Sequence, residues 1–300
     1  MSQANPFRRI ARILVRPALK LLRGPSRQRR RLYIRSIHAR PSDPGTRVLI
    51  FGQGRSGTTV LESLICSTGL FVPNDEPLIG LGRGSLWPTA YVRGCSRDPA
   101  RQGPGGNYIC HVKPDHLERY RMESGRAPAD IQAFVHSLVR DRWHIIHAQR
   151  RDLVRQVLSE IVGEARGQLH KKGQWHKRDD VREELTVHVD RENFFERIRY
   201  NQALRVRERE ILKGIPHLSV IYEYDLLDPA AHERTVNTVL SHVGLTRSGS
   251  VSTDLRKINT RPIPEIVENY QEFAVWVRDL GLEDSLTAES QTSERHSLGQ

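Results

Sequence analysis

Two kinds of apolar pattern follow one another along this chain. Short runs of β-branched and large apolar residues predict strands near 47–52, 70–72, 108–113, 143–149 and 217–223. Apolar residues at helical spacing predict helices near 57–68, 129–141, 151–166, 190–213, 229–243 and 263–280. Strands that alternate with helices predict an α/β fold, with a mostly parallel sheet and helices on both faces. Ligands of such sheets bind at the carboxyl ends of the strands.

Two stretches do not follow these patterns. The segment from Pro77 to Asn107 is rich in glycine and proline and shows little periodicity. Loops of that length are usually functional or disordered, and this one is placed where a substrate would enter. Together with the segment 167–189, it is where we expect substrate specificity to reside, and the sequence does not identify the substrate.

The first predicted strand runs directly into a glycine-rich turn. Val48 to Phe51 have the apolar character of a buried parallel strand, and Gly52, Gly54 and Gly57 permit backbone angles that other residues resist. Helical spacing resumes at Val60, which places the turn at a helix N-terminus. Unpaired N–H groups and the helix dipole favour an anion there, so the turn is predicted to bind phosphate.

Three families use loops of this kind. The spacing Gly52-x-x-x-x-Gly57 fits a nucleotide triphosphate P-loop, but Thr58 stands where that motif needs its lysine. Gly52-x-Gly54-x-x-Gly57 also fits the dinucleotide fingerprint, with Asp75 and Glu76 following at the distance of the ribose-binding acid. A dinucleotide turn does not require the run Arg55-Ser-Gly-Thr-Thr59. That run resembles the 5′-phosphosulfate-binding loop of sulfotransferases.

A second motif supports the same family. The predicted strand at 143–149 leads into a helix, and Arg151 and Ser159 lie eight residues apart across that junction. Sulfotransferases have an arginine at a strand end and a serine eight residues later, which bind the 3′-phosphate of 3′-phosphoadenosine 5′-phosphosulfate (PAPS). Arg150 could take the arginine role instead. Taken alone, the pair would more often be a solvated helix surface.

The resemblance covers roughly residues 47–286 and is closest to the bacterial nodulation-factor and trehalose sulfotransferases. It implies a P-loop-like three-layer sandwich, PAPS as co-substrate with PAP as product, and no metal. The implied cofactor-binding residues are Gly54, Arg55, Ser56, Gly57, Thr58, Thr59, Arg150, Arg151, Ser159 and Tyr222. The implied catalytic residues are Glu76 as base, Arg55 and Lys113, with His116 as the alternative base.

Softer landmarks are the element Gln174-Trp-His176, the segment Tyr222 to Leu227 and the segment Glu268-Asn-Tyr270. The chain also departs from the cytosolic branch of the family. It lacks a late glycine-rich segment for the 3′-phosphate, and assigning that charge to Arg256 and Lys257 is speculative.

Charge is distributed unevenly. The chain has 47 Lys and Arg against 35 Asp and Glu, and 12 of the basic residues lie within positions 1–40, where there is no acidic residue. The remaining 35 basic residues balance the 35 acidic ones, so the body is formally neutral and a nucleic-acid partner is not expected. We expect an N-terminal extension at 1–42, a sulfotransferase domain at 43–286 and a flexible tail at 287–300.

The extension combines an apolar helical stripe with basic residues and contains no apolar run long enough to span a bilayer. A membrane-surface contact through residues 5–23 and a solvated basic tail are both open, so the expected location is the cytoplasm, with or without peripheral membrane contact.

Cysteine and histidine do not predict a metal or disulfide framework. Cys66, Cys95 and Cys110 are irregularly spaced, and the 13 histidines show no zinc-binding spacing.

The sequence leaves three functions open: a PAPS-dependent sulfotransferase that acts on a carbohydrate or glycolipid hydroxyl, a dinucleotide (NAD or FAD) oxidoreductase, and a non-catalytic nucleotide-binding protein.

Overall fold

The structure is a computed structural model that describes residues 45–79, 87–123, 125–167, 185–247, 249–255 and 261–287. The predictions for the N-terminal extension, for Gln174-Trp-His176, for Arg256 and Lys257, and for nearly all of the C-terminal tail fall outside these ranges.

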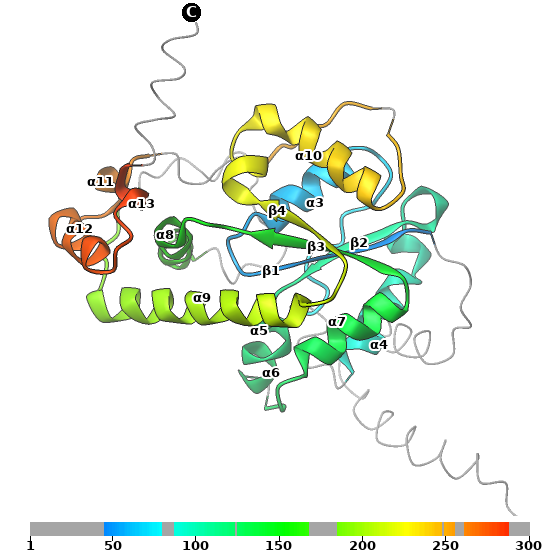
Figure 1. Ribbon diagram of the computed structural model, residues 1–300, viewed down its shortest axis with the longest axis horizontal. Helices are drawn as coiled ribbons and strands as arrows, with labels where there is room; N and C mark the ends of the chain where they lie inside the picture. Colours follow the sequence, from blue (N-terminus) through cyan, green and yellow to red (C-terminus); the bar gives the residue numbers. More distant parts are fainter. Residues whose placement is uncertain are drawn as a thin grey trace, which may run out of the picture.

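A parallel sheet forms the centre of the described chain. Its strands are β1 (Arg47–Gly52), β2 (Tyr108–Val112), β3 (Trp143–Gln149) and β4 (His217–Ile221), in the order β2-β1-β3-β4, and every pairing is parallel. The predicted α/β fold with a parallel central sheet and helices on both faces is confirmed (Figure 1).

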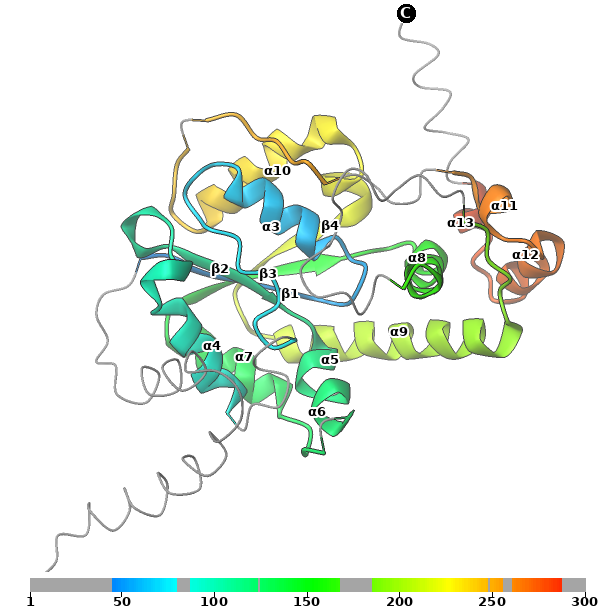
Figure 2. The same ribbon diagram turned by 180° about the vertical axis from the view of Figure 1, so that it is seen from behind.

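Side chains alternate between the two faces of the sheet. Val48 and Ile50 of β1 pack with α3 (Thr58–Cys66) and α10 (Pro229–His242) on one face. Figure 2 shows these two helices together on that side of the strands. Because strand side chains point alternately to opposite faces, the neighbouring residues of β1 must serve the other layer.

Leu49 and Phe51 pack on the opposite face. There they meet α4 (Pro88–Ser96), α7 (Ile131–Arg140) and the end of α9 (Arg191–Leu212), which cover the sheet from the other side (Figures 1 and 2). Both faces of β1 are therefore buried, which explains its continuous apolar run.

A third apolar cluster lies beside the sheet. It joins α8 (Leu153–Ala165) and the first half of α9 to α11 (Ile263–Ile266) and α12 (Tyr270–Asp279), with Phe194 and Phe273 in edge-to-face contact at 4.9 Å between ring centroids. The short helix α13 (Asp284–Thr287) follows α12. Two further short helices, α5 (Pro114–Leu117) and α6 (Arg119–Glu123), follow β2.

Aspartates fix the start of several helices. Asp190 accepts a hydrogen bond from the Asn193 N–H at 2.8 Å at the start of α9, and Asp228 accepts one from the Ala230 N–H at 2.9 Å at the start of α10.

The predicted strand at 70–72 is wrong. Phe71 is buried in the same cluster as α3, and the Leu70 carbonyl accepts a hydrogen bond from the Asn107 side-chain amide at 3.3 Å. The apolar run there serves packing under a loop and does not pair with a strand.

The expected loop at 77–107 is also partly wrong. Its described part contains α4, whose Tyr91, Val92 and Cys95 are buried, and two short 3₁₀ turns, η1 (Pro99–Arg101) and η2 (Pro104–Gly106). The buried side of α4 includes Gly94 and Ser96, so the sequence shows no clear apolar stripe there.

The predicted helix 263–280 is interrupted between α11 and α12. The Val187 N–H donates to the Ile266 carbonyl at 2.8 Å, and the Glu268 N–H donates to the Val187 carbonyl at 3.0 Å. This β-bridge, between Val187 and Val267, draws residues 267–269 out of helical geometry.

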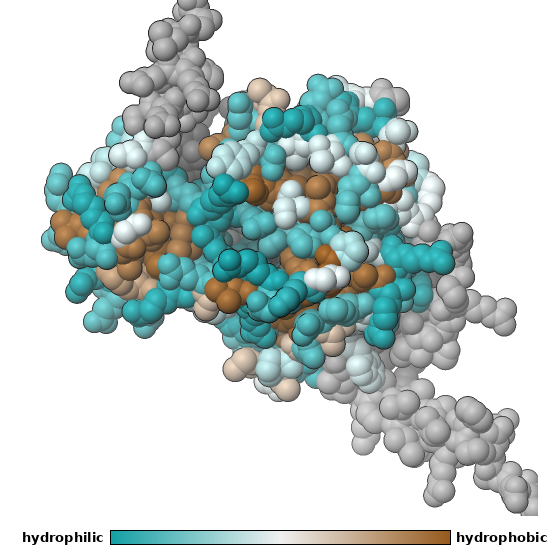
Figure 3. Space-filling model, in the orientation of Figure 1, coloured by the Kyte–Doolittle hydropathy of each residue, from teal (hydrophilic) through white to brown (hydrophobic). Residues whose placement is uncertain are grey.

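No helix within the described ranges combines the length and the apolar character needed to cross a membrane. The face in Figure 3 is mostly hydrophilic, with separate apolar areas over the sheet-covering helices and over α11–α13.

We expect Gly52→Ala to destabilise the protein much more than Gly54→Ala. A Cβ at Gly52 would overlap the Ala148 backbone carbonyl, whereas one at Gly54 would meet its nearest atom, a Glu160 carboxylate oxygen, at 4.0 Å. Overpacking against backbone costs about 1–3 kcal/mol or more. Urea denaturation of both variants measures the difference, and equal midpoints would contradict the close approach of β1 to β3.

Candidate functional site

The carboxyl ends of all four strands meet at one edge of the sheet. In the parallel register, Gly52 of β1 lies opposite Ala148 of β3, and Phe51 lies opposite Val112 of β2. The next residues along the chain are the glycine-rich loop after β1, Lys113 after β2, Arg150 and Arg151 after β3, and Tyr222 after β4. Most of the residues that the sequence predicts for the site are therefore brought to this edge.

The glycine-rich loop turns sharply into α3. Arg55 and Gly57 adopt left-handed backbone conformations, with φ of 61° and 87°. Gly57 is the N-cap of α3 and has no side chain with which to cap the N–H groups of the first turn of that helix. Thr58 is buried and Thr59 is half-buried at the start of α3. An N-terminus of this kind suits an anion.

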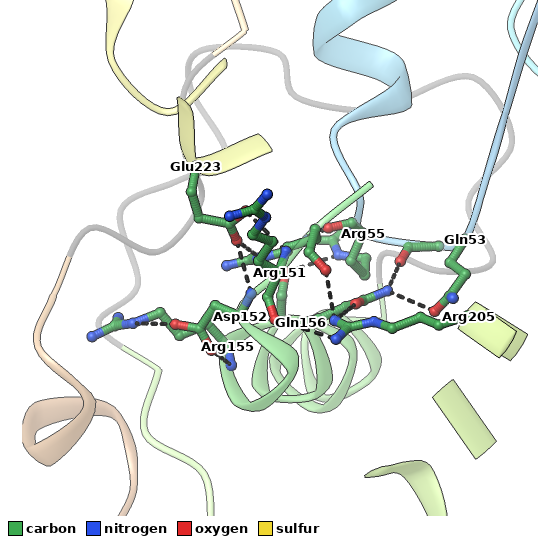
Figure 4. A network of polar contacts seen from close by, with 11 residues as sticks. Gln53, Arg55, Arg151, Asp152, Arg155, Gln156, Arg205 and Glu223 are labelled. Atoms are coloured by element: carbon green, nitrogen blue, oxygen red, sulfur yellow. Dashed lines mark hydrogen bonds and ion pairs between the residues drawn. The ribbon is translucent and has the colours of Figure 1, made fainter. Parts of the chain in front are cut away.

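The glycine-rich loop is held by hydrogen bonds within the loop and by a side chain of α8. Ser56 is buried, and its hydroxyl donates to the Gln53 carbonyl at 2.8 Å. The Gln156 amide donates to the Gly54 carbonyl at 2.9 Å and to the Gln53 side-chain oxygen at 3.2 Å (Figure 4). Gln53 in turn donates to the buried carboxylate of Glu208 on α9 at 3.1 Å. The Ser56 hydroxyl thus fixes the shape of the loop.

Two arginines converge above the loop. The Arg55 Nε donates to the Ser159 hydroxyl at 2.8 Å, and Arg150 Nη1 donates to the Arg55 carbonyl at 3.4 Å. Burial, together with the charge of Arg150, lowers the pKa of Arg55 below its usual value. An anion bound between the two guanidinium groups would relieve this repulsion. We refer to Arg55 and Arg150 as the cation pair.

Two tyrosines from the turn after β4 contact the guanidinium groups of Arg150 and Arg151. The Arg150 guanidinium lies 4.7 Å from the ring centroid of Tyr222, and that of Arg151 lies 4.9 Å from the centroid of Tyr224. The turn, η3 (Tyr222–Leu226), has π-helical geometry, which is frequent at functional sites. The Glu223 carboxylate accepts a hydrogen bond from the Arg151 N–H at 2.9 Å, which ties this turn to the start of α8 (Figure 4).

The structure therefore brings Ser159 to Arg55 and leaves the Arg151 side chain exposed on Tyr224. Tyr222 also lies against the glycine-rich loop, because a Cβ on Gly57 would stand 2.7 Å from its ring. That Arg151 and Ser159 share a phosphate stays a prediction.

A second group of residues surrounds Glu76. We call Glu62, Glu76, His111, Lys113 and His116 the acid–histidine cluster. Glu76 forms an ion pair with Lys113, its Oε1 lies 3.0 Å from His111 Nε2, and its Oε2 lies 3.4 Å from His116 Nε2. Glu62 is buried on α3, and its Oε2 lies 2.7 Å from His111 Nδ1.

Opposing effects set the charges in this cluster. Burial would raise the pKa of Glu76, but Lys113, His111 and His116 outweigh it and hold that pKa well below its usual value. Burial would lower the pKa of His111, but Glu62 and Glu76 raise it to about 9. At neutral pH the structure therefore contains a Glu76 carboxylate beside a His111 imidazolium.

The two histidines differ in protonation. The Lys113 backbone N–H donates to His116 Nδ1 at 3.1 Å, so the proton of a neutral His116 ring lies on Nε2, which faces Glu76. Burial lowers the pKa of His116 below its usual value, although Glu76 opposes that shift. A neutral His116 in this tautomer can donate to Glu76 and has no free lone pair to accept a proton.

Sequence reasoning missed Glu62, His111 and Glu160. Glu62 interrupts the buried stripe formed by Leu61, Leu64 and Ile65, and a buried acid needs a partner, which was the available signal. Glu160 follows Ser159 on α8 and faces Gly54. Burial raises the pKa of Glu160 to about 7, against the opposing charge of Arg197.

Within the described part of the chain, no group of three or more His, Cys, Asp or Glu residues is arranged to hold a metal ion, and Cys66, Cys95 and Cys110 are free thiols. His144 and His147 lie on β3.

Comparison with known proteins gives distant structural likeness alone. No protein-family model matches the chain, and no curated protein matches its sequence. Among solved structures, the chain is similar to the crystal structure of a sulfotransferase from Alicyclobacillus acidocaldarius, with 12% sequence identity and a TM-score of 0.39 over 80% of this chain and 95% of the other. At that level of similarity the match identifies neither an activity nor the residues that carry it.

The raised pKa of His111 should make stability depend on pH. Because the folded-state pKa of about 9 exceeds the usual value of 6.5, the His111 contribution is complete below about pH 6.5 and is lost as pH rises through 9. The loss is at most about 3 kcal/mol. Urea denaturation at pH 6.5 and 9.5 should show a smaller difference for His111→Gln than for the wild type. Equal differences would refute the charged state of His111.

Proposed function

We propose that this chain is a sulfotransferase that moves the sulfuryl group of PAPS to a hydroxyl of a carbohydrate or glycolipid acceptor. The observation that carries the proposal is the cation pair of Arg55 and Arg150, which lies at the uncapped N-terminus of α3 with Ser159 as its hydroxyl partner. Two adjacent, partly buried cations with one ion-paired carboxylate, that of Glu223, are costly, and a phosphosulfate group would supply further negative charge.

The register of the sheet supports placing a base beside this phosphate site. Lys113 follows β2 directly, and β2 pairs in register with β1, which leads into the glycine-rich loop. Glu76 is held against Lys113 and is thus at the same sheet edge. Two neighbouring sites support this proposal. The cation pair suits the anionic phosphosulfate donor, and the Glu76 carboxylate suits the proton of a hydroxyl acceptor.

The residues have these roles in the proposed reaction. PAPS supplies an activated sulfuryl group on a phosphate leaving group. Arg55, Arg150 and the first N–H groups of α3 hold that phosphate and stabilise the negative charge that grows on it as the S–O bond breaks. The acceptor oxygen forms a bond to sulfur, its proton passes to the Glu76 carboxylate, and the products are a sulfate ester and PAP.

Lys113 and Glu76 act together in this scheme. Lys113 keeps Glu76 ionised and so ready to accept a proton, at the cost of making it a weak base. A weak base suffices where bond breaking to the leaving group runs ahead of proton transfer, by analogy with loose phosphoryl transfer. The tautomer of His116 favours Glu76 over His116 as the base.

The dinucleotide alternative is less compatible with these contacts. It needs an acid free to bind a ribose after the second strand, whereas Glu76 is engaged by His111 and Lys113, and residues 70–72 form no strand. The third possibility is a nucleotide-binding protein without catalytic activity. Mutation of Glu76 distinguishes it from an enzyme, because such a protein would bind nucleotide and would not depend on Glu76.

Calorimetry should detect PAP binding that depends on its 3′-phosphate. We expect the wild type to prefer PAP to AMP and to NAD at the same salt concentration, because Arg151 is proposed to bind the additional 3′-phosphate while Arg55 binds the 5′-phosphate. Arg55→Ala and Arg151→Ala should each weaken PAP binding by about 10- to 100-fold, the worth of a charge-assisted contact. Arg278→Ala, which removes an exposed arginine on α12, is the matched control. Equal affinity for PAP and AMP, or preference for NAD, would overturn the proposed cofactor.

Glu76→Gln should abolish sulfuryl transfer while PAP affinity stays within about twofold. Removal of a general base typically lowers turnover by about 100-fold or more. Transfer from radiolabelled PAPS to a panel of saccharides and glycolipids provides the assay, with Glu233→Gln on the exposed face of α10 as the control. Unchanged transfer in Glu76→Gln would exclude it as the base.

A further inference from the structure

His111, the strand residue that contacts Glu76, is itself held in place by a second carboxylate. His111 lies on β2 opposite Ile50 of β1, and its ring is buried. Its Nε2 lies 3.0 Å from Glu76 and its Nδ1 lies 2.7 Å from Glu62. A ring that contacts a carboxylate through each nitrogen is satisfied when both nitrogens carry protons, since each then donates to an acceptor.

Glu62 is fixed as firmly as the ring that it contacts. Its Oε1 accepts hydrogen bonds from the backbone N–H groups of Asn74 at 2.8 Å and Asp75 at 3.0 Å. The His111 N–H donates to the Asp75 carbonyl at 3.1 Å. Glu62 therefore ties together α3, the segment that carries Glu76, and β2.

The position of Glu62 on α3 connects this anchor to the phosphate site. Thr58 and Thr59 form the first turn of α3, at the N-terminus where the glycine-rich loop ends, and Glu62 lies one turn further along. A single rigid helix thus presents N–H groups to an anion at its start and a carboxylate to His111 about one turn later.

We propose that His111 and Glu62 are positioning residues for the Glu76 base: Glu62 holds His111 as a cation, and His111 fixes Glu76 at a set distance from the phosphate loop through α3. This inference rests on the proposed role of Glu76. It assigns no contact with substrate to either residue. The titratable groups that face Glu76 are His111 from β2, Lys113 that follows β2, and a neutral His116 from α5.

Histidine NMR tests the anchor independently of any activity. In the full chain labelled with ¹⁵N-histidine, the signal that disappears in His111→Asn belongs to His111. We expect it to be an imidazolium at pH 7.5 that titrates near pH 9, and Glu62→Gln to lower its pKa by more than one unit, since the largest favourable contact is lost. A wild-type His111 that titrates near pH 6.5, or one that Glu62→Gln does not shift, would overturn the proposal.

The pH dependence of turnover separates positioning from a purely structural role. Loss of the His111 cation lets the pKa of Glu76 rise, so the acidic limb of the kcat/KM profile should move to higher pH in His111→Asn and Glu62→Gln. The value of kcat should fall at least tenfold at neutral pH, while KM for PAPS changes less than threefold. Glu118→Gln, which removes a carboxylate paired with Arg207 at the surface, is the control and should keep the wild-type profile.

Failure of this inference is distinguishable from failure of the proposed function. If the wild type transfers no sulfuryl group and does not bind PAP, the function is wrong, and the NMR titration still decides the anchor. If the wild type is active and the variant profiles superimpose on it, His111 is not a positioning residue. Retained PAP binding in each variant, measured by calorimetry, shows that the variant is folded.

Discussion

Parallel pairing of β1 with both β2 and β3 is the constraint on which every feature of the site depends. The register places Gly52 against Ala148 and Phe51 against Val112, so that the chain leaves three neighbouring strands at the same level. A shift of one residue in β1 would exchange its two buried faces and would move the glycine-rich loop away from Arg150. The close approach of Gly52 to the Ala148 carbonyl allows this register, because a side chain at that position would separate the strands.

The charged residues at this edge of the sheet form two groups, the cation pair and the acid–histidine cluster, which differ in net charge. In the cation pair at the loop, the Arg150 Nε lies 3.7 Å from the Glu223 carboxylate, which also accepts hydrogen bonds from the backbone at the start of α8, and burial raises the pKa of Glu160 to about 7. One shared carboxylate does not balance two guanidinium groups, so the cation pair still suits an external anion. In the acid–histidine cluster, by contrast, two carboxylates face two cations, Lys113 and a charged His111, so it is neutral by itself. α3 contributes to both, with its N-terminus beside the cation pair and Glu62 in the acid–histidine cluster, so the binding of an anion and the handling of a proton are separated along one helix.

The sequence predicted what depends on local pattern and missed what depends on contact between distant segments. β1, β3 and the start of α9 follow from apolar runs and a capping aspartate, and they are confirmed. The strand at 70–72 was wrong because apolar residues that pack under a loop look like a short strand until their hydrogen-bond partners are known. His111 was missed for the same reason: on β2 it is one polar residue in an apolar run, and only the fold brings Glu62 and Glu76 to its two nitrogens from 49 and 35 residues away.

The lowered pKa of Glu76 bears on how the proposed transfer can work. A carboxylate stabilised by Lys113 and His111 has little affinity for a proton, so it cannot generate an alkoxide before the acceptor attacks sulfur. The driving force must come from the leaving side, where Arg55, Arg150 and the N-terminus of α3 stabilise the departing phosphate. The acceptor hydroxyl becomes acidic only as its bond to sulfur forms, and at that stage a weak, correctly placed base is sufficient. For the proposed transfer, the position of the Glu76 carboxylate therefore matters more than its basicity. An anchored His111 would fix that position.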